Sequence, residues 1–274
     1  MRFLPLLLLL FSLQALAAEK PLVVVSVLPQ KTIVEGVAGD FVHVEVMVGK
    51  GFNPATYQPS PRQIARLSRA VLYVRAGMPF EQSWLPRFMA VNPSMKMLDM
   101  REGLELLPAH HGHDSDPHIW TDPVRVKQHA QKLREVLSKM YPDSKGLFQR
   151  NYEAFAARLD ALDKELKTTL TPVQGQGFLV YHPAWSYFAH RYGLKQIAVE
   201  QEGKEPNPRS LARLIETAQQ AHIHTILVQP QHSSATARVL ADAIGARLVQ
   251  MDPLDPDIFS ALRRLAAVLT GKQP

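Results

Sequence analysis

The sequence contains no cysteine among its 274 residues. This absence excludes disulfide bonds and thiolate metal sites, so any bound metal ion would have to be held by nitrogen and oxygen atoms. The fold must therefore be stabilised by its hydrophobic cores alone. A hydrophobic content of 46% in a chain of this length allows one large core or two smaller ones.

After its first residues, the sequence also lacks any run of about 18 apolar residues that would predict a transmembrane helix. The N-terminus, MRFLPLLLLLFSLQALAAEK, has one basic residue, a short apolar run and an Ala-x-Ala pattern. These features predict a secretory signal peptide over residues 1–17. We expect an exported, soluble protein, most simply in a bacterial periplasm. Because no cysteine follows the cleavage site, we do not expect a lipid anchor.

Two further absences narrow the function. Lys and Arg outnumber Asp and Glu by 31 to 25, giving a net charge of +6, but the basic residues are scattered and not interleaved with aromatic ones. Nucleic acid is therefore not an expected partner. The motifs HExxH and GxSxG do not occur, so the sequence does not predict an enzyme.

From residue 22 onward, apolar runs alternate with amphipathic segments. Leu22–Leu28 and Val42–Val48 are predicted strands, Ser60–Gln63 resembles a helix start with a capping box, and Phe80–Val91 predicts a helix interrupted at Pro86. The same alternation resumes after residue 172. Nearly continuous apolar strands separated by helices predict parallel sheets that are covered on both faces.

Residues 143–170 differ from the rest because they contain no proline and carry one apolar stripe. The stripe recurs at steps of three or four residues: Tyr152, Phe155, Leu159, Leu162, Leu166 and Leu170. It predicts a single helix about 40 Å long, which suits a connection between two bodies. The expected fold is α/β, with two parallel-sheet lobes (18–142 and 171–274), a long rigid helix joining them (143–170) and a cleft between them.

Three polar side chains stand where such a fold places ligands. Parallel sheets bind ligands beyond the carboxyl ends of their strands. His182 follows the predicted strand FLVY, Asp252 follows RLVQM, and His118 lies in DPHIW before a helix. If the lobes face each other, all three point into one cleft. Two imidazoles and one carboxylate suit Zn²⁺.

Five segments of the chain resemble, in order, the zinc- and manganese-binding proteins of bacterial ABC importers, the ZnuA/TroA type: DPHIWTDP, YHPAWSYFAHRYGL, VEQEGKEPNPRSLARLI, VQPQHSSATARVLADAIGA and MDPL. The resemblance implies that a divalent metal ion is bound between two lobes and delivered to an ABC permease in the inner membrane. It places His118, His182 and Asp252 at ligand positions. Manganese-selective members tend to have a carboxylate where this chain has His182, so the resemblance favours Zn²⁺, with Mn²⁺ as the alternative. A monomer is expected.

One family position is not matched. The family's first histidine comes from a loop of the form PHTYEPSP, whereas this chain reads PATYQPSP, with Ala55 at the histidine position. Three replacements are open: a water molecule, a histidine from the loop HHGH, or His232 in VQPQHSS. The loop supplies three candidates: His110, His111 and His113.

Two other functions remain open beside metal delivery. With three protein ligands and an open position, the site could be that of a zinc-dependent hydrolase. A degenerate family member could instead bind a partner or a metal chelate. Since ligating histidines nearly always donate to an acceptor, we also note Glu81, Glu200 and Glu202 as possible acceptors.

Overall fold

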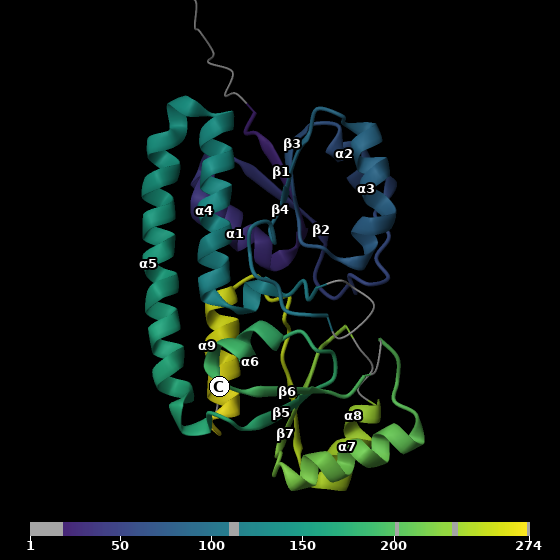
Figure 1. The fold of residues 1–274 in the computed structure, drawn as a ribbon. Coiled ribbons are helices and arrows are strands. Elements are labelled where there is room, and N and C mark those ends of the chain that lie inside the picture. The colour runs from purple at the N-terminus through teal and green to yellow at the C-terminus, as the bar shows by residue number, and fades with distance from the viewer. Residues whose placement is uncertain (1–18, 110–114, 201–202, 232–234, 273–274) are drawn as a thin grey trace, which may run out of the picture.

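The computed structural model describes residues 19–109, 115–200, 203–231 and 235–272. The predicted signal peptide therefore lies outside the described residues. The described chain forms two α/β lobes, one above the other, beside a pair of long helices (Figure 1). This confirms the predicted fold class.

Each lobe contains a four-stranded parallel sheet, and the two sheets share one strand order. The N-terminal sheet has the order β2-β1-β3-β4, from β1 (Leu22–Val27), β2 (His43–Val48), β3 (Ala70–Arg75) and β4 (Lys96–Asp99). The C-terminal sheet has the order β6-β5-β7-β8, from β5 (Gly177–Val180), β6 (Lys195–Ala198), β7 (Thr225–Val228) and β8 (Arg247–Gln250). The inner strands are β1 and β3 in one sheet and β5 and β7 in the other, and in both lobes their carboxyl ends lie toward the junction between the lobes (Figure 1).

Helices cover both sheets. Those that precede the long helix are α1 (Leu28–Ala38), α2 (Pro61–Leu67), α3 (Pro79–Val91) and α4 (Pro123–Met140). Those that follow it are α6 (Ser186–Tyr192), α7 (Pro208–Gln220), α8 (Ala235–Ile244) and α9 (Ile258–Leu269).

The start of α2 follows the predicted capping box. The Gln63 N–H donates to the Ser60 hydroxyl at 3.3 Å, and the Ser60 N–H donates to Gln63 Oε1 at 3.0 Å. The prediction for α3 was partly wrong, because the helix continues through Pro86. Phe80 and Phe88 are buried on either side of the proline, so packing outweighs the lost backbone donor.

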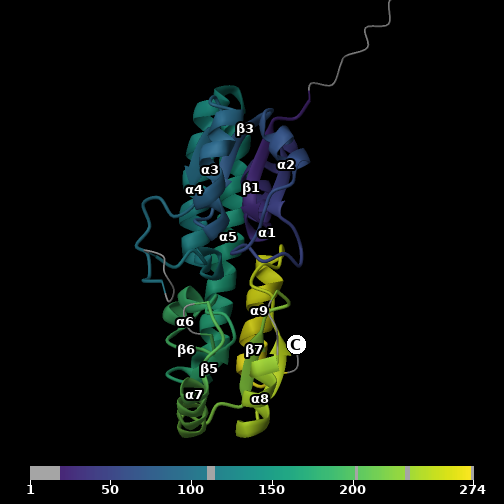
Figure 2. The ribbon, with the colours of Figure 1, turned by 90° about the vertical axis from the view of Figure 1, so that its right-hand side faces the viewer.

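The long helix α5 (Lys145–Leu170) has 26 residues and runs along both lobes (Figures 1 and 2). It begins two residues after the predicted start, behind a short 3₁₀ turn at Pro142–Ser144. Its buried stripe packs against α1 and α4 above and against α6 and α9 below. Because both lobes pack on one continuous helix, α5 limits how far they can move apart.

One face of the C-terminal sheet joins a large hydrophobic core that extends into the N-terminal lobe. The other face of this sheet packs in a separate, smaller core. Phe178 and Val180 of β5 belong to the large core that includes the N-terminal lobe, α5 and α9. Leu179 and Tyr181 alternate to the other face, where they form a separate small core with α7 and α8. The α7–α8 layer is therefore held by fewer buried side chains than the rest of the molecule.

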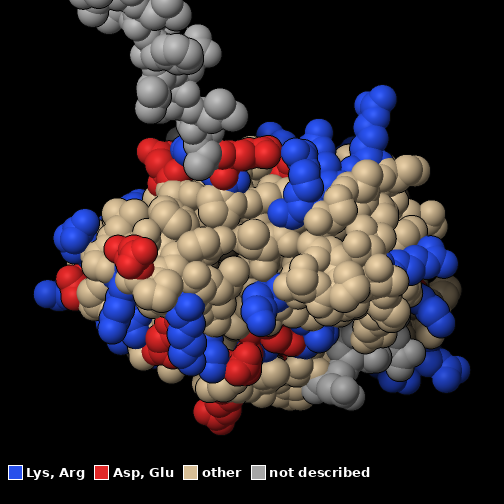
Figure 3. Space-filling view, turned by 90° about the horizontal axis from the view of Figure 1, so that it is seen from above, with Lys and Arg blue, Asp and Glu red and all other residues tan. Residues whose placement is uncertain are grey.

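The described helices include none that is both long enough and apolar enough to cross a membrane. Around the rim of the face at the top of the N-terminal lobe, basic and acidic side chains are interspersed (Figure 3).

Candidate metal centre

His118 is held by the residue two positions before it. Its backbone N–H donates to Asp116 Oδ1 at 2.9 Å, and its ring Nδ1 lies 2.7 Å from the same oxygen. Burial acts to raise the pKa of Asp116, but the charge and hydrogen bonds of His118 outweigh burial and keep this pKa below its usual value. The carboxylate therefore stays ionised and fixes the ring through Nδ1.

His182 follows β5 and is held by the two neighbouring strands. Its ring Nδ1 lies 2.6 Å from Oε1 of the buried Glu200, which follows β6. The side chain of Gln229, which follows β7, accepts from the His182 N–H at 3.1 Å and donates to its carbonyl at 2.8 Å. The flanking strand ends thus fix both the backbone and the ring of His182.

The His118 and His182 imidazoles lie side by side, although His118 precedes α5 in the chain and His182 follows it. Their ring centroids are 5.3 Å apart, with an interplanar angle of 71°. Because a carboxylate engages Nδ1 in each ring, a shared metal ion would be bound by Nε2. Two imidazoles bound at ~2.1 Å in tetrahedral geometry would have centroids roughly 5 Å apart. The observed separation fits this arrangement.

Asp252 follows β8, and the structure gives its Oδ1 two donors. The Gln231 side-chain N–H₂ and the Leu254 backbone N–H each donate to Oδ1 at 2.9 Å. As arranged, no group of three or more His, Asp or Glu side chains in the described ranges could hold a metal ion. The structure thus pairs His118 with His182, and Asp252 as the third ligand stays a prediction.

The remaining predicted donors cannot be placed. His110, His111 and His113 fall in 110–114, and His232 falls in 232–234, all outside the described residues. Ala55 is exposed, and its N–H donates to Asn53 Oδ1 at 2.8 Å in a local turn.

The predicted acceptors have different outcomes. Glu200 is the acceptor for His182, as noted from the sequence, and Glu202 lies outside the described residues. Glu81 was the wrong choice, because it lies in the interior of the N-terminal lobe. Asp116 was not predicted as the acceptor for His118, although its position two residues before that histidine was a usable signal.

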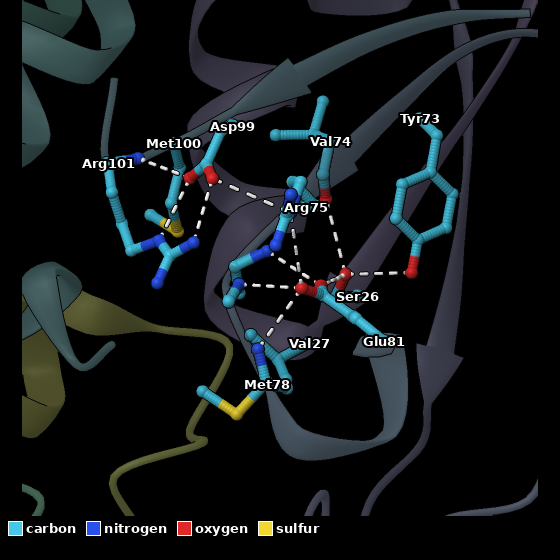
Figure 4. Close-up of polar contacts among 12 residues, drawn as sticks. Ser26, Val27, Tyr73, Val74, Arg75, Met78, Glu81, Asp99, Met100 and Arg101 are labelled. Carbon is cyan, nitrogen blue, oxygen red and sulfur yellow. Dashed lines mark hydrogen bonds and ion pairs between the residues drawn. The ribbon is translucent and has the colours of Figure 1, made fainter. Parts of the chain in front are cut away.

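Glu81 belongs to a charged cluster at the carboxyl ends of β1, β3 and β4 (Figure 4). It accepts from the backbone N–H groups of residues 76–78 at 2.7–3.1 Å and from the Ser26 hydroxyl. Burial raises its pKa, and these hydrogen bonds act in the opposite direction. Arg75 Nε lies 3.6 Å from its Oε2. Every charge in this part of the cluster has a partner within the N-terminal lobe.

Asp99 completes the same cluster. Arg101 Nε and Nη2 donate to its two oxygens at 3.0 and 2.8 Å, and Arg75 Nε lies 3.5 Å away. The Arg101 guanidinium packs against Gly77, whose φ is +87°, and a Cβ at Gly77 would lie 2.3 Å from Arg101 Cζ. At the N-terminal strand ends, Asp99 is therefore paired with arginine, while Glu81 accepts backbone hydrogen bonds and lies near Arg75.

Together, two α/β lobes on a continuous helix and a pair of carboxylate-oriented histidines at their junction define a two-lobed metal-binding protein. A family model described as "Zinc-uptake complex component A periplasmic", or ZnuA, matches residues 23–269. The chain belongs to this family.

Named relatives and a solved structure agree with this assignment. The chain is 30% identical over 250 residues to the zinc-binding lipoprotein AdcA of Streptococcus pneumoniae serotype 4, covering 85% of this chain but only 50% of AdcA. It is 28% identical over 255 residues to the high-affinity zinc uptake system protein ZnuA of Bacillus subtilis, covering 86% and 79%. A crystal structure of ZnuA superposes with a TM-score of 0.89 at 37% identity, covering 93% of this chain and 99% of the other. The chain thus spans about half the length of AdcA and nearly all of the solved ZnuA.

Proposed function

We propose that this protein captures Zn²⁺ outside the cytoplasm and delivers it to the permease of an ABC importer. The observation that carries the proposal is the pairing of His118 and His182 at 5.3 Å, each with a carboxylate on Nδ1. Membership of a zinc-uptake family supports the same cargo. The finer assignments follow from the sequence: the periplasm as location, the inner-membrane permease as partner and a monomeric state.

In this proposal His118 and His182 bind the ion through Nε2, and Asp252 provides an oxygen. Two imidazole nitrogens favour Zn²⁺, whereas Mn²⁺ prefers sites dominated by carboxylate, carbonyl and water oxygens. Mn²⁺ is therefore the alternative to Zn²⁺ as cargo. Because Ala55 cannot ligate, we assign the fourth position to water, with a histidine of 110–113 or His232 as the alternatives.

The test is a titration of metal-stripped mature protein with zinc, manganese and nickel, followed by calorimetry. Zinc should bind most tightly of the three, and absence of zinc binding tighter than about 10 μM would contradict the proposal. Ala55→His then examines the fourth position. A tenfold gain in affinity indicates that water occupies it, while no gain, combined with a loss on deleting residues 110–113, indicates a loop histidine.

The location is proposed from the family description and from the predicted signal peptide. The AdcA relative is named as a lipoprotein, so the expectation that this chain lacks a lipid anchor stays a prediction. Cell fractionation and mass measurement of the exported protein would determine both the compartment and any lipid.

The metallohydrolase alternative depends on the open position at Ala55. A catalytic zinc needs a bound water and a nearby general base. Zinc-loaded protein should show no turnover on ester, phosphoester and amide substrates. Turnover that disappears in His182→Ala would replace metal delivery with catalysis.

A further inference from the structure

The end of β7 contacts the candidate ligands on both sides of it. In the sheet order β6-β5-β7-β8, this strand lies between the strand that precedes His182 and the strand that precedes Asp252. The segment Val-Gln-Pro-Gln after β7 places Gln229 on the His182 side and Gln231 on the Asp252 side. Pro230 between them restricts the backbone, and the two amides reach residues on opposite sides of β7.

Gln229 and Gln231 act on different parts of their neighbours. Gln229 is buried and makes two hydrogen bonds with the His182 backbone, so it sets where that residue lies. Gln231 instead donates to a carboxylate oxygen that could bind the metal ion, Asp252 Oδ1, at 2.9 Å. Of these two glutamines, Gln231 is therefore the one that can change how many oxygens Asp252 offers to a metal ion.

The donor count at Asp252 Oδ1 determines its coordination chemistry. An ionised carboxylate has about two lone pairs on each oxygen. The Gln231 amide and the Leu254 backbone N–H occupy both lone pairs of Oδ1. A metal ion can then be bound through Oδ2 alone, so Asp252 is restricted to one oxygen.

We infer that Gln231 is a specificity-determining residue, because it makes Asp252 a one-oxygen ligand and thereby favours Zn²⁺ over Mn²⁺. Zn²⁺ is satisfied with four donors, whereas Mn²⁺ seeks about six, mostly oxygens. A carboxylate that offers both oxygens raises the coordination number and favours Mn²⁺. This inference rests on the proposed function, since it requires that Asp252 binds the ion.

Gln231→Met removes the donor and keeps the side-chain length. Leu254 N–H still donates to Oδ1, but one lone pair of that oxygen is released. Zinc and manganese affinities are measured by competition with a chelator on metal-stripped protein. We expect the ratio of zinc to manganese affinity to fall about tenfold, which corresponds to about 1.4 kcal/mol. A purely structural role would lower both affinities by the same factor and leave the ratio unchanged.

Two further variants complete the design. Gln231→Glu keeps the side-chain shape but adds a negative charge, and it serves in case the methionine variant folds poorly. It should also lower the ratio, because a carboxylate cannot donate. Gln219→Met is the matched control: Gln219 lies exposed on α7, where its amide makes only a 3.5 Å contact with the Ala243 carbonyl. That variant should retain the wild-type ratio.

Cobalt provides a readout that does not depend on affinity. The visible absorption of protein-bound Co²⁺ weakens as its coordination number rises above four. We expect an intense spectrum for the wild-type protein and a weaker one for Gln231→Met. An unchanged ratio together with an unchanged spectrum overturns the inference and leaves the proposed function intact. A wild-type protein that binds no zinc overturns both.

Discussion

The two lobes share a strand order but organise the charges at their strand ends differently. In the N-terminal lobe, Arg75 and Arg101 pair with Asp99, and Arg75 also lies near Glu81. In the C-terminal lobe, the partners described for Glu200 and Asp252 are a histidine and neutral amides. A carboxylate paired with arginine is already neutralised, whereas one paired with a histidine or an amide can still stabilise a cation. One topology thus forms an arginine-paired cluster in the N-terminal lobe, whereas in the C-terminal lobe it places carboxylates beside a histidine and amides.

The core follows the same division. The edge strands of the N-terminal sheet, β2 and β4, bury four of their ten residues, whereas the edge strands of the C-terminal sheet, β6 and β8, bury none of their eight. The C-terminal sheet buries one face in the large core and the other against α7 and α8. The lobe that provides two of the three proposed ligands is therefore the one with the less buried sheet, which suits a site that must take up and release an ion.

The largest effect should come from removing an imidazole. His182→Ala should weaken zinc binding about a thousandfold, or ~4 kcal/mol, because the ion loses a nitrogen donor whose orientation is fixed by Glu200. His190→Ala is the control, since His190 is exposed on α6 of the same lobe. Calorimetry with metal-stripped protein measures both. Equal, small losses in the two variants would remove His182 from the site.

The N-terminal cluster should respond in stability and not in metal binding. Glu81→Gln replaces one acceptor oxygen with an amide N–H₂ facing backbone donors. It should cost about 3 kcal/mol in the free energy of unfolding. Denaturant unfolding measures this change, while zinc affinity of the folded variant should stay within about twofold of wild type. A loss of zinc affinity as large as that of His182→Ala would show that the Glu81 cluster takes part in metal binding and would end the comparison.

Acid should destabilise the N-terminal lobe through a buried histidine on α4. Burial lowers the pKa of His129 to about 4, although Asp99 acts to raise it. An unfolded histidine has a pKa near 6.5, so between about pH 6.5 and 4 the unfolded chain binds a proton that the folded chain does not. Stability is complete above this window and falls by up to about 3 kcal/mol as the pH drops through it.

His129→Leu should therefore flatten the dependence of unfolding free energy on pH between 6.5 and 4. His43→Leu serves as the control, because the His43 side chain is exposed on β2. Denaturant unfolding of metal-free protein at several pH values compares the three proteins. An acid loss in His129→Leu equal to that of wild type would assign the loss to other groups.

Sequence patterns predicted the elements well where local and tertiary preferences agree. The apolar runs predicted the strands, and the stripe at steps of three or four predicted α5. The prediction failed where packing overrides a local signal, as at Pro86 within α3. It also failed at the end of β1, because Leu28, the last residue of the predicted strand, begins α1.

The site could be predicted only in part for a different reason. Positions after strands indicated His182 and Asp252, because the carboxyl ends of parallel strands meet at one edge. His118 was indicated by its place in DPHIW before a helix. The choice of acceptor depends on which strand ends are neighbours, and the sequence does not contain that order. Glu81 and Glu200 were therefore equivalent candidates, although only Glu200 contacts a candidate ligand.

The smallest effects on zinc affinity should come from replacing the two acceptors, Asp116 behind His118 and Glu200 behind His182. The two variants test whether both histidines bind the same ion. Glu200→Gln and Asp116→Asn each keep an acceptor oxygen near the imidazole Nδ1 but remove its charge. Each should lower zinc affinity about tenfold, at the low end for an acceptor behind a metal-bound histidine. Competition with a chelator measures both, and the double variant should lose about a hundredfold if the two act independently. Equal losses indicate that His118 and His182 share the ion. A loss confined to Glu200→Gln would contradict this and would place metal capture in the C-terminal lobe alone.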